Sequence, residues 1–206
     1  MRLLLSVLLL AVGLSALAQD DAEKQIGSAL GMTLGKKLKA PAEGKDKKDK
    51  KDTKDTKAAP KTLTDRDGTV FQVYTPPKTH EPFTEYLVCV TPTTKVVAQI
   101  LARAKLASKD EATAERDKLM KALEKRYGAR SGGGDPLANL ATMLDGAVII
   151  QGTRYVMVTV EPEGTQSMLC LRYADKTLTS KVKDEHLELE RGRDLNPGER
   201  LPNNAL

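Results

Sequence analysis

The segment from residue 45 to residue 57 reads KDKKDKKDTKDTK and divides the chain into two unequal parts. It has no apolar side chain, so ordering it would cost conformational entropy with no burial to offset that cost. We therefore predict a disordered linker over residues 41–60. Because Asp is interleaved with Lys, we favour a solvated spacer over the alternative, a patch for anionic envelope polymers or lipid headgroups.

The first 18 residues have the parts of a secretory signal peptide. Arg2 precedes an apolar run over residues 3–14, and Ala16-Leu17-Ala18 then supplies an A-x-A cleavage motif. The run is shorter than the roughly 20 apolar residues that a membrane-spanning helix needs. We expect cleavage before Gln19 and a soluble mature chain in the periplasm or outside the cell.

Residues 19–40 have the spacing of a glycine-spaced amphipathic helix. Apolar residues and glycines each recur every four positions, and the helix-packing candidates are Ile26, Gly27, Leu30, Gly31, Leu34, Gly35 and Leu38. Aligned glycines let two helices approach closely, although each costs the helix about 1 kcal/mol relative to Ala. Three interpretations stay open. The helix docks on the folded domain or self-associates, it makes weak contact with a membrane surface through its apolar seam and nearby Lys residues, or it folds only on a partner.

The folded domain is predicted over residues 61–192, because all seven aromatic residues lie between Phe71 and Tyr173. Side chains alternate between turn signals in six segments, which predicts strands at 69–74, 85–91, 95–105, 147–150, 153–160 and 166–173. These strands and the helices described next indicate an α+β fold. We expect an antiparallel sheet of about five or six strands with helices packed on one face.

Helix boundaries are signalled by capping residues. Ser108 with Glu111 forms a capping box that begins a helix ending at Gly128. Asp135 and Pro136 open a short helix that Gly146 closes. An amphipathic stretch over residues 181–191 places Val182, His186 and Leu189 together before Gly192, and residues 193–206 are predicted to be a disordered tail.

Motifs for catalysis, cofactors and metals are scarce. The Gly132–Gly134 run leads into Asp135 instead of the Lys-Ser or Lys-Thr of a phosphate-binding loop. No G-x-S-x-G, H-x-x-x-H or C-x-x-C motif occurs. We therefore name no catalytic, cofactor-binding or metal-binding residue and predict no cofactor.

The charge distribution argues against nucleic acid as a partner. The formal net charge is +5, but residues 58–206 carry 21 basic and 20 acidic side chains. A nucleic-acid footprint needs basic residues gathered on a folded face. Here the basic excess lies in the linker, which has no aromatic residue for stacking on bases.

The two cysteines, Cys89 and Cys170, fall at the centres of two predicted strands. An even pair in an oxidising compartment favours a disulfide, and such a bridge requires the two strands to be neighbours. Two separately buried thiols, or a catalytic Cys with His80 or His186, are the alternatives.

The function expected from these features is binding. We predict an exported, non-enzymatic interaction module that contacts an envelope protein through an exposed strand edge or the N-terminal helix, with self-association through that helix as a further possibility. The competing class is a small secreted hydrolase whose catalytic residues the sequence does not identify.

Overall fold

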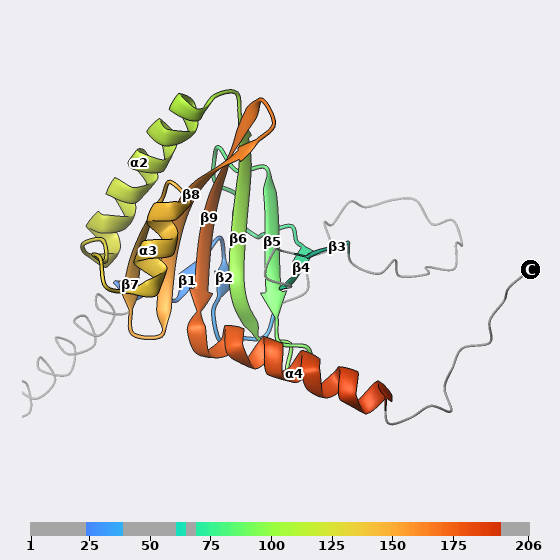
Figure 1. The fold of residues 1–206 in the computed structure, drawn as a ribbon. Helices are drawn as coiled ribbons and strands as arrows, with labels where there is room; N and C mark the ends of the chain where they lie inside the picture. The colour runs from blue at the N-terminus through green and yellow to red at the C-terminus, as the bar shows by residue number, and fades with distance from the viewer. Residues whose placement is uncertain (1–23, 39–60, 65–68, 195–206) are drawn as a thin grey trace, which may run out of the picture.

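The computed structural model describes residues 24–38, 61–64 and 69–194. Its main element is a seven-stranded antiparallel sheet with the strand order β3-β4-β5-β6-β9-β8-β7 (Figure 1). A separate two-stranded hairpin, β1-β2, comes from the N-terminal part of the chain. The elements are β1 (Ser28–Ala29), β2 (Met32–Thr33), β3 (Thr62–Thr64), β4 (Val70–Val73), β5 (Glu85–Val90), β6 (Val97–Leu106), α2 (Lys109–Tyr127), α3 (Pro136–Met143), β7 (Ala147–Gln151), β8 (Arg154–Glu163), β9 (Gln166–Asp175) and α4 (Lys176–Asp194).

The predicted class is confirmed, since the domain is mixed α+β with a large antiparallel sheet. All six predicted strands are present within a few residues of their expected bounds. The seventh is β3, an edge strand of three residues that pairs with β4, Leu63 standing opposite Phe71. Three residues are too few for an alternating pattern, which is why the expected number of strands was too low.

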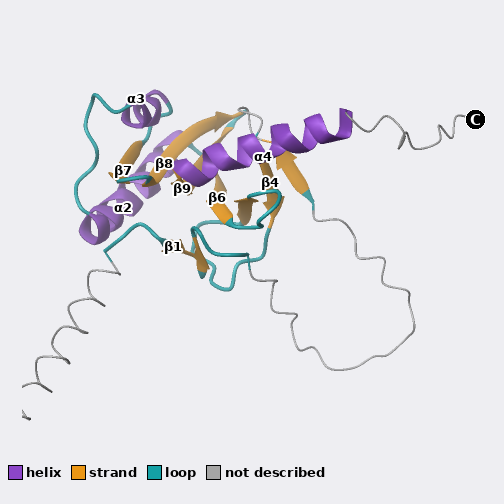
Figure 2. Cartoon of the chain, turned by 90° about the horizontal axis from the view of Figure 1, so that it is seen from below, coloured by secondary structure: helices purple, strands orange, loops and turns teal. Residues whose placement is uncertain are grey.

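The prediction that the helices cover one face of the sheet is wrong. Helix α2 packs with Val156, Val158 and Leu171 on one face, which we call the α2 face. Helices α3 and α4 lie on the opposite face, which we call the α4 face (Figure 2). The long strands β6, β8 and β9 are buried on both faces and therefore need covering elements on both sides.

The largest part of the core lies between α2 and the sheet. The helix contributes four buried side chains, Ala112, Met120, Leu123 and Tyr127. Facing them are buried residues of the central strands: Tyr86, Val88, Ile100, Ala102, Val156, Val158, Val160, Leu169, Leu171 and Tyr173. These positions follow the period-two alternation read from the sequence, so the α2 face was predictable from the pattern alone.

The capping signals predicted for α2 and α3 are confirmed. The Ser108 hydroxyl accepts a hydrogen bond from Glu111 N at 3.2 Å, and Glu111 Oε2 accepts one from Ala107 N at 3.0 Å. Asp135 Oδ1 accepts from Leu137 N at 2.8 Å and so caps α3. Gly146 follows α3 where a Cβ would lie 2.3 Å from the Val158 carbonyl oxygen, so only glycine fits against β8.

The predicted N-terminal helix is wrong for residues 24–38, a segment that we call the N-terminal strap. Its chain forms the β1-β2 hairpin and turns instead of a helix. Leu30, Gly31 and Gly35 have left-handed φ angles of 56°, 79° and 79°, which a right-handed helix does not contain. Gly31 and Gly35 therefore serve turns and not a helix-packing seam.

The strap packs on the α2 face beside helix α2. Ile26 and Leu34 are among the most buried side chains of the domain, and Leu30 and Leu38 pack against the same core cluster. Its backbone pairs with the start of β6, where Gly35 N donates to the Val97 carbonyl and Val97 N donates to the Lys36 carbonyl, both at 2.9 Å. The strap thus completes the cover of this face that α2 leaves open.

Helix α4 differs from its predicted form at both ends. It begins at Lys176, because Asp175 Oδ1 accepts hydrogen bonds from Thr177 N and Leu178 N and so caps it. It continues through Gly192, which was predicted to end it, to Asp194. Val182 is buried as predicted, but Leu189 is 45% exposed, and the next buried position on this side is Glu185.

Three of the predicted segments cannot be compared with the structure. The signal peptide, the linker and residues 195–206 of the predicted tail lie outside the described residues. Within the described part of the chain, no helix has the length and apolar character needed to cross a membrane.

Candidate functional site

The predicted disulfide between Cys89 and Cys170 is wrong, and the strand order explains why. Both side chains point to the α4 face, yet β6 lies between the strands that carry them. Cys89 stands opposite Gln99 of β6 and Cys170 stands opposite Arg103, four residues further along. Two strand spacings alone separate the Cα atoms by about 10 Å, beyond the roughly 7 Å limit for a bridge, and no disulfide joins them.

The two histidines lie on different elements. His80 is in the loop before β5, where its ring Nδ1 contacts the Glu81 carbonyl oxygen and its ring centroid lies 6.4 Å from that of Phe83. His186 lies on α4. Within residues 24–38, 61–64 and 69–194, no group of three or more His, Cys, Asp or Glu side chains could hold a metal ion.

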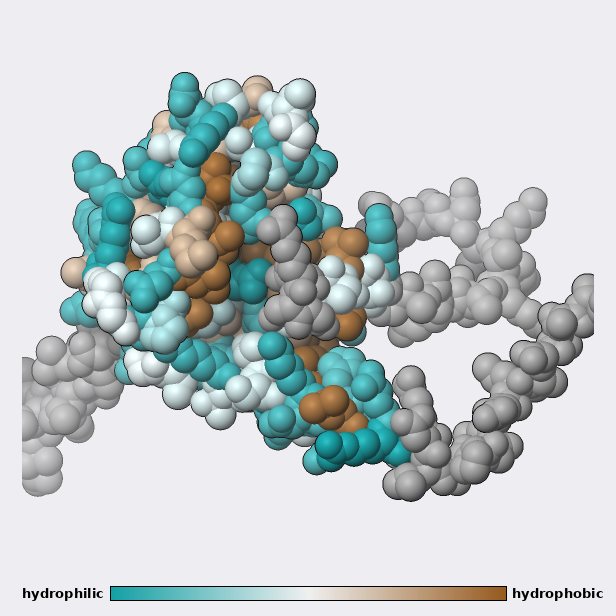
Figure 3. Space-filling model, viewed as in Figure 1, coloured by the Kyte–Doolittle hydropathy of each residue, from teal (hydrophilic) through white to brown (hydrophobic). Residues whose placement is uncertain are grey.

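A hollow that combines charged and apolar side chains lies on the α4 face, and we call it the sheet pocket. Six strands line it, with the residues Leu63, Thr64, Phe71, Leu87, Leu101, Arg103, Glu161, Cys170 and Arg172, around a volume of about 220 Å³. Figure 3 views this face and shows polar and apolar side chains side by side over the sheet.

The positions of the helices explain why the sheet pocket exists. Helix α4 crosses β6 and β9 at one end of the sheet, and α3 lies over β7 and β8 (Figure 1). Between them, no helix of the described chain lies over the middle of β6 and β9. The sheet pocket therefore has an apolar floor, with Leu87 and Leu101, and charged side chains around it.

Two guanidinium groups enter the sheet pocket from neighbouring strands. Arg172 of β9 places its guanidinium over the Phe71 ring, 5.8 Å from the centroid, and its Nη1 donates to Gln99 Oε1 at 3.5 Å. Arg103 of β6 pairs with Glu85 at 3.3 Å. Arg172 thus combines stacking on an aromatic ring with hydrogen bonding through its planar guanidinium, the group that proteins commonly use to recognise a carboxylate or a similar anion.

The Cys170 thiol shares this pocket. Cys170 stands opposite Arg103 across the β6-β9 ladder and lies two residues before Arg172 on the same face. Cys89 has a different environment, since it is fully buried in the apolar cluster with Phe71, Ala98 and Val182 of α4. The sequence predicted that both cysteines lie at strand centres. It did not predict their different surroundings, because these depend on where α4 packs.

The sheet pocket was not predicted from the sequence, although one signal was present. Arg103 and Arg172 each interrupt an apolar strand on the face opposite to its regular alternation. A long charged side chain at the centre of a buried strand needs a polar environment. This signal could have identified two of the lining residues, but not that they meet, because that depends on the pairing of β6 with β9.

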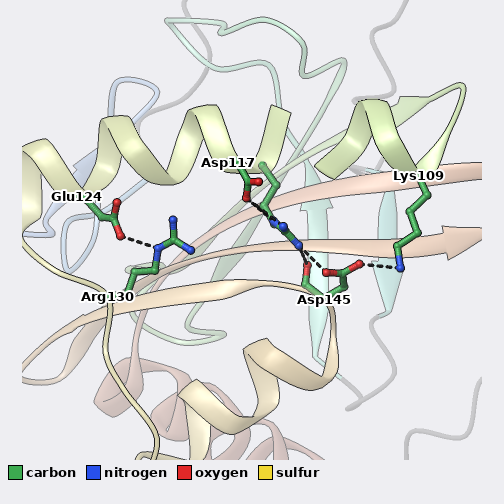
Figure 4. Close-up of polar contacts among 6 residues, drawn as sticks. Lys109, Asp117, Glu124, Arg130 and Asp145 are labelled. Atoms are coloured by element: carbon green, nitrogen blue, oxygen red, sulfur yellow. Dashed lines mark hydrogen bonds and ion pairs between the residues drawn. The ribbon is translucent and has the colours of Figure 1, made fainter. Parts of the chain in front are cut away.

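A second polar cluster joins α2 to the turn between α3 and β7 (Figure 4). Arg116 Nη1 donates to Asp145 Oδ1 at 2.5 Å and to the Asp145 carbonyl oxygen at 2.8 Å, and Lys109 Nζ lies 2.9 Å from Asp145 Oδ2. The hydrogen bond from Lys109, together with Arg116, lowers the pKa of Asp145 below its ordinary value. Because every charge in this cluster is matched, we assign it a structural role.

Comparisons with known proteins give no match to this chain among protein-family models, curated proteins or solved structures.

Proposed function

We propose that this protein is an exported, non-enzymatic binding module that holds a partner protein of the cell envelope on the α4 face of its sheet. The single observation that carries the proposal is the sheet pocket, in which Arg103 and Arg172 lie over the buried side chains of Leu87 and Leu101. Arginine is enriched at protein interfaces relative to the rest of the surface. Export rests on the signal-peptide pattern of the first 18 residues.

The other surfaces considered from the sequence support binding less well. The strap belongs to the core of the domain, so it does not offer a free helix. The β7 edge is partly occupied, since Ser131 N donates to the Val148 carbonyl at 2.8 Å and Ile150 N donates to Ser131 Oγ at 3.1 Å. The opposite edge, β3, is three residues long, which is short for recognition by an added strand.

The experiment is site-specific photo-crosslinking in the cells that make the protein. A photoreactive residue replaces Lys105, which is exposed and lies on the α4 face beyond Arg103. The matched control replaces Lys121, an exposed lysine of α2 on the other side of the sheet. We expect a discrete adduct with one envelope protein from position 105 and none from position 121.

Binding is then measured with the purified partner. Lys105→Glu reverses one charge beside the sheet pocket, at an exposed lysine that pairs with Glu163 at 2.7 Å, and we expect it to weaken binding about tenfold, the effect of roughly 1.4 kcal/mol. Lys121→Glu should leave the affinity unchanged. Adducts of equal yield from both positions, or equal affinities for the two variants, would contradict the proposal.

A further inference from the structure

Three exposed lysines meet where the end of the strap pairs with the turn before β6. Lys37 stands opposite Val96 in an antiparallel bridge, and Leu38 N donates to the Lys95 carbonyl oxygen at 3.2 Å. Antiparallel neighbours lie about 5 Å apart, so the Cα atoms of Lys36, Lys37 and Lys95 lie within about 8 Å of one another. We call these three side chains the lysine patch.

The segments that form the lysine patch contain no acidic residue. The strap and the turn over residues 91–96 together hold four lysines and neither Asp nor Glu. Within residues 24–38, 61–64 and 69–194, no ion pair joins the three lysines to a carboxylate. The lysine patch is therefore a local concentration of positive charge on a domain whose charges are otherwise nearly balanced.

The carboxylates that adjacent elements bring towards the lysine patch are balanced by basic residues. Asp175 pairs at 3.2 Å with Arg154, the arginine whose guanidinium donates to the strap. Residues 181–185 of α4 reach the turn through the hydrogen bond from Thr93 N to Glu185, and they carry two lysines and two acidic residues. These neighbours are neutral as groups, so they leave the positive charge of the lysine patch in place.

The residue type of the lysine patch favours a broad anionic surface as its ligand. Arginine holds a single carboxylate or phosphate with a rigid fork of donors, whereas lysine is a hydrated point charge on a flexible stem. Attraction of lysines to an anionic lipid surface needs proximity and no fixed geometry. The apolar side chains Ile26, Met32 and Leu34 of the strap are buried in the domain, so the contact is electrostatic and does not depend on insertion into the hydrocarbon.

We propose that the lysine patch binds the surface of a membrane that contains anionic phospholipids. The ammonium groups of the three lysines lie against the headgroup phosphates, and each adds to the attraction because none is neutralised by a carboxylate of the described chain. This contact is separate from the sheet pocket, which is lined by other strands.

The test is a vesicle-binding assay with the purified chain from Gln19 onward, the predicted mature form, because the apolar segment before it would bind lipid by itself. Vesicles of phosphatidylcholine and phosphatidylglycerol in equal parts are compared with vesicles of phosphatidylcholine alone, and cosedimentation measures the bound fraction. We expect at least tenfold stronger binding to the anionic vesicles at low ionic strength. Raising the salt from about 0.05 M to about 0.5 M should remove most of this difference, because the screening length falls to a few ångströms.

Substitutions then locate the contact. Lys36→Gln together with Lys37→Gln removes two charges from the lysine patch, and we expect at least tenfold weaker binding to the anionic vesicles. The matched control, Lys121→Gln with Lys125→Gln, removes two exposed charges from α2 and should weaken binding less than threefold. Lys95→Gln should also weaken binding, although it lies in a different segment from the other two lysines. All variants keep residues 45–57, so the charge of that segment is constant, and their thermal midpoints show that they fold.

Equal losses for the two double variants would overturn this inference, because net charge alone would then explain the binding. Equal binding of the unsubstituted chain to both kinds of vesicle would do so as well. Preference for soluble polyphosphate over anionic vesicles at the same phosphate concentration would also contradict it, since the ligand would then be a polymer and not a membrane. The assay contains no partner protein, so its outcome is independent of the binding proposed above.

Discussion

Asp145 contributes to the structure through both its backbone conformation and its side-chain ion pairs. It has a left-handed φ of 50°, and its carboxylate joins Lys109 and Arg116 of α2 to the turn before β7. Asn tolerates this backbone conformation about as well as Asp does, so Asp145→Asn removes the charge without straining the turn. This substitution isolates the ionic contribution.

We expect Asp145→Asn to lower the free energy of unfolding by about 1 kcal/mol, because it weakens charge-assisted hydrogen bonds to the largely buried Arg116. Asp117→Asn is the matched control, since Asp117 also pairs with Arg116 but its side chain is 55% exposed. That substitution should change stability by less than about 0.5 kcal/mol. Urea denaturation of both variants measures the difference, and equal losses would show that the turn does not depend on this cluster.

Glu185 makes stability depend on pH. Its Oε2 accepts a hydrogen bond from Thr93 N at 2.7 Å in the turn between β5 and β6. This bond, with Lys181 as a further contributor, lowers the pKa of Glu185 below its ordinary value of 4.5. A depressed carboxyl pKa stabilises the fold above the unfolded-state pKa, and that stabilisation is lost as pH falls through the folded-state pKa.

The thermal midpoint of Glu185→Gln should therefore lie below that of the unsubstituted chain at pH 7. The gap should narrow as the pH is lowered from about 5 towards 3, where the carboxyl of the parent protein becomes protonated. Thermal unfolding monitored by circular dichroism at several pH values tests this. A gap that stays constant over this range would mean that the charge of Glu185 makes no contribution.

At the scale of elements, Gly31→Ala distinguishes the strap from the predicted helix, because the two structures predict opposite changes in the free energy of unfolding. In a helix, Gly31→Ala would stabilise by about 1 kcal/mol. In the strap, Gly31 has a φ of 79°, and a Cβ there would lie 3.1 Å from Pro77. We expect the variant to lose about 1 to 2 kcal/mol in the free energy of unfolding.

Gly133→Ala is the control for this experiment. No heavy atom lies within 4 Å of a Cβ built at Gly133, and its φ is not among the positive ones, so the change should stay within about 0.5 kcal/mol. Chemical denaturation of both variants measures the two changes. A stabilised Gly31→Ala protein would restore the helical interpretation of this segment.

Capping residues and glycines in the sequence predicted those helices whose ends depend on residues close by in the chain. Ser108, Asp135 and Gly146 act within a few residues of their own position, and the helices that they bound were predicted correctly. The predicted start of α4, at residue 181, is too late. Asp175 both ends β9 and caps the helix, so α4 begins directly at Lys176. The strap was mispredicted because leucines and glycines at four-residue spacing satisfy a helical pattern, while contacts far along the chain decide its actual form.

The candidate site depends on a pairing that no local pattern contains. Strand β9 lies between β6 and β8, and this insertion brings Arg103 beside Cys170 and separates Cys170 from Cys89. Cys170 and Arg172 lie two residues apart on β9, so the alternation of side chains along a strand is enough to put them on one face. Which strand lies beside them follows from long-range packing, so the disulfide and the sheet pocket were both beyond a sequence-based prediction.

For the whole molecule, the strand order predicts that reducing agents do not change stability. A bridge between the cysteines would have closed a loop of about 80 residues and contributed about 4.5 kcal/mol. Since β6 separates them, the thermal midpoint should be the same with and without dithiothreitol. Denatured protein that was never reduced should contain two thiols per chain when titrated, and a lower midpoint after reduction would contradict the strand order.

Export makes a separate prediction about the mature chain. The A-x-A motif at Ala16–Ala18 predicts cleavage before Gln19, five residues before the start of the described strap. Intact mass spectrometry of the protein from the extracellular or periplasmic fraction should give a chain that begins at Gln19. A mass that includes Met1 would show that the segment is retained.

The anchors of the strap determine when the fold can be completed during synthesis. Gln151 Oε1 accepts from Ile26 N at 2.8 Å, and Arg154 Nη1 donates to the Ile26 carbonyl at 3.4 Å, so the partners are 125 and 128 residues apart along the chain. The strap is the first described segment to be synthesised, and it cannot form these hydrogen bonds until residues 151–154 have been synthesised as well. Contacts of such long sequence separation form slowly. The strap therefore cannot cover its part of the α2 face until residues 151–154 have been made, and α4, which packs on the other face, is made only after them.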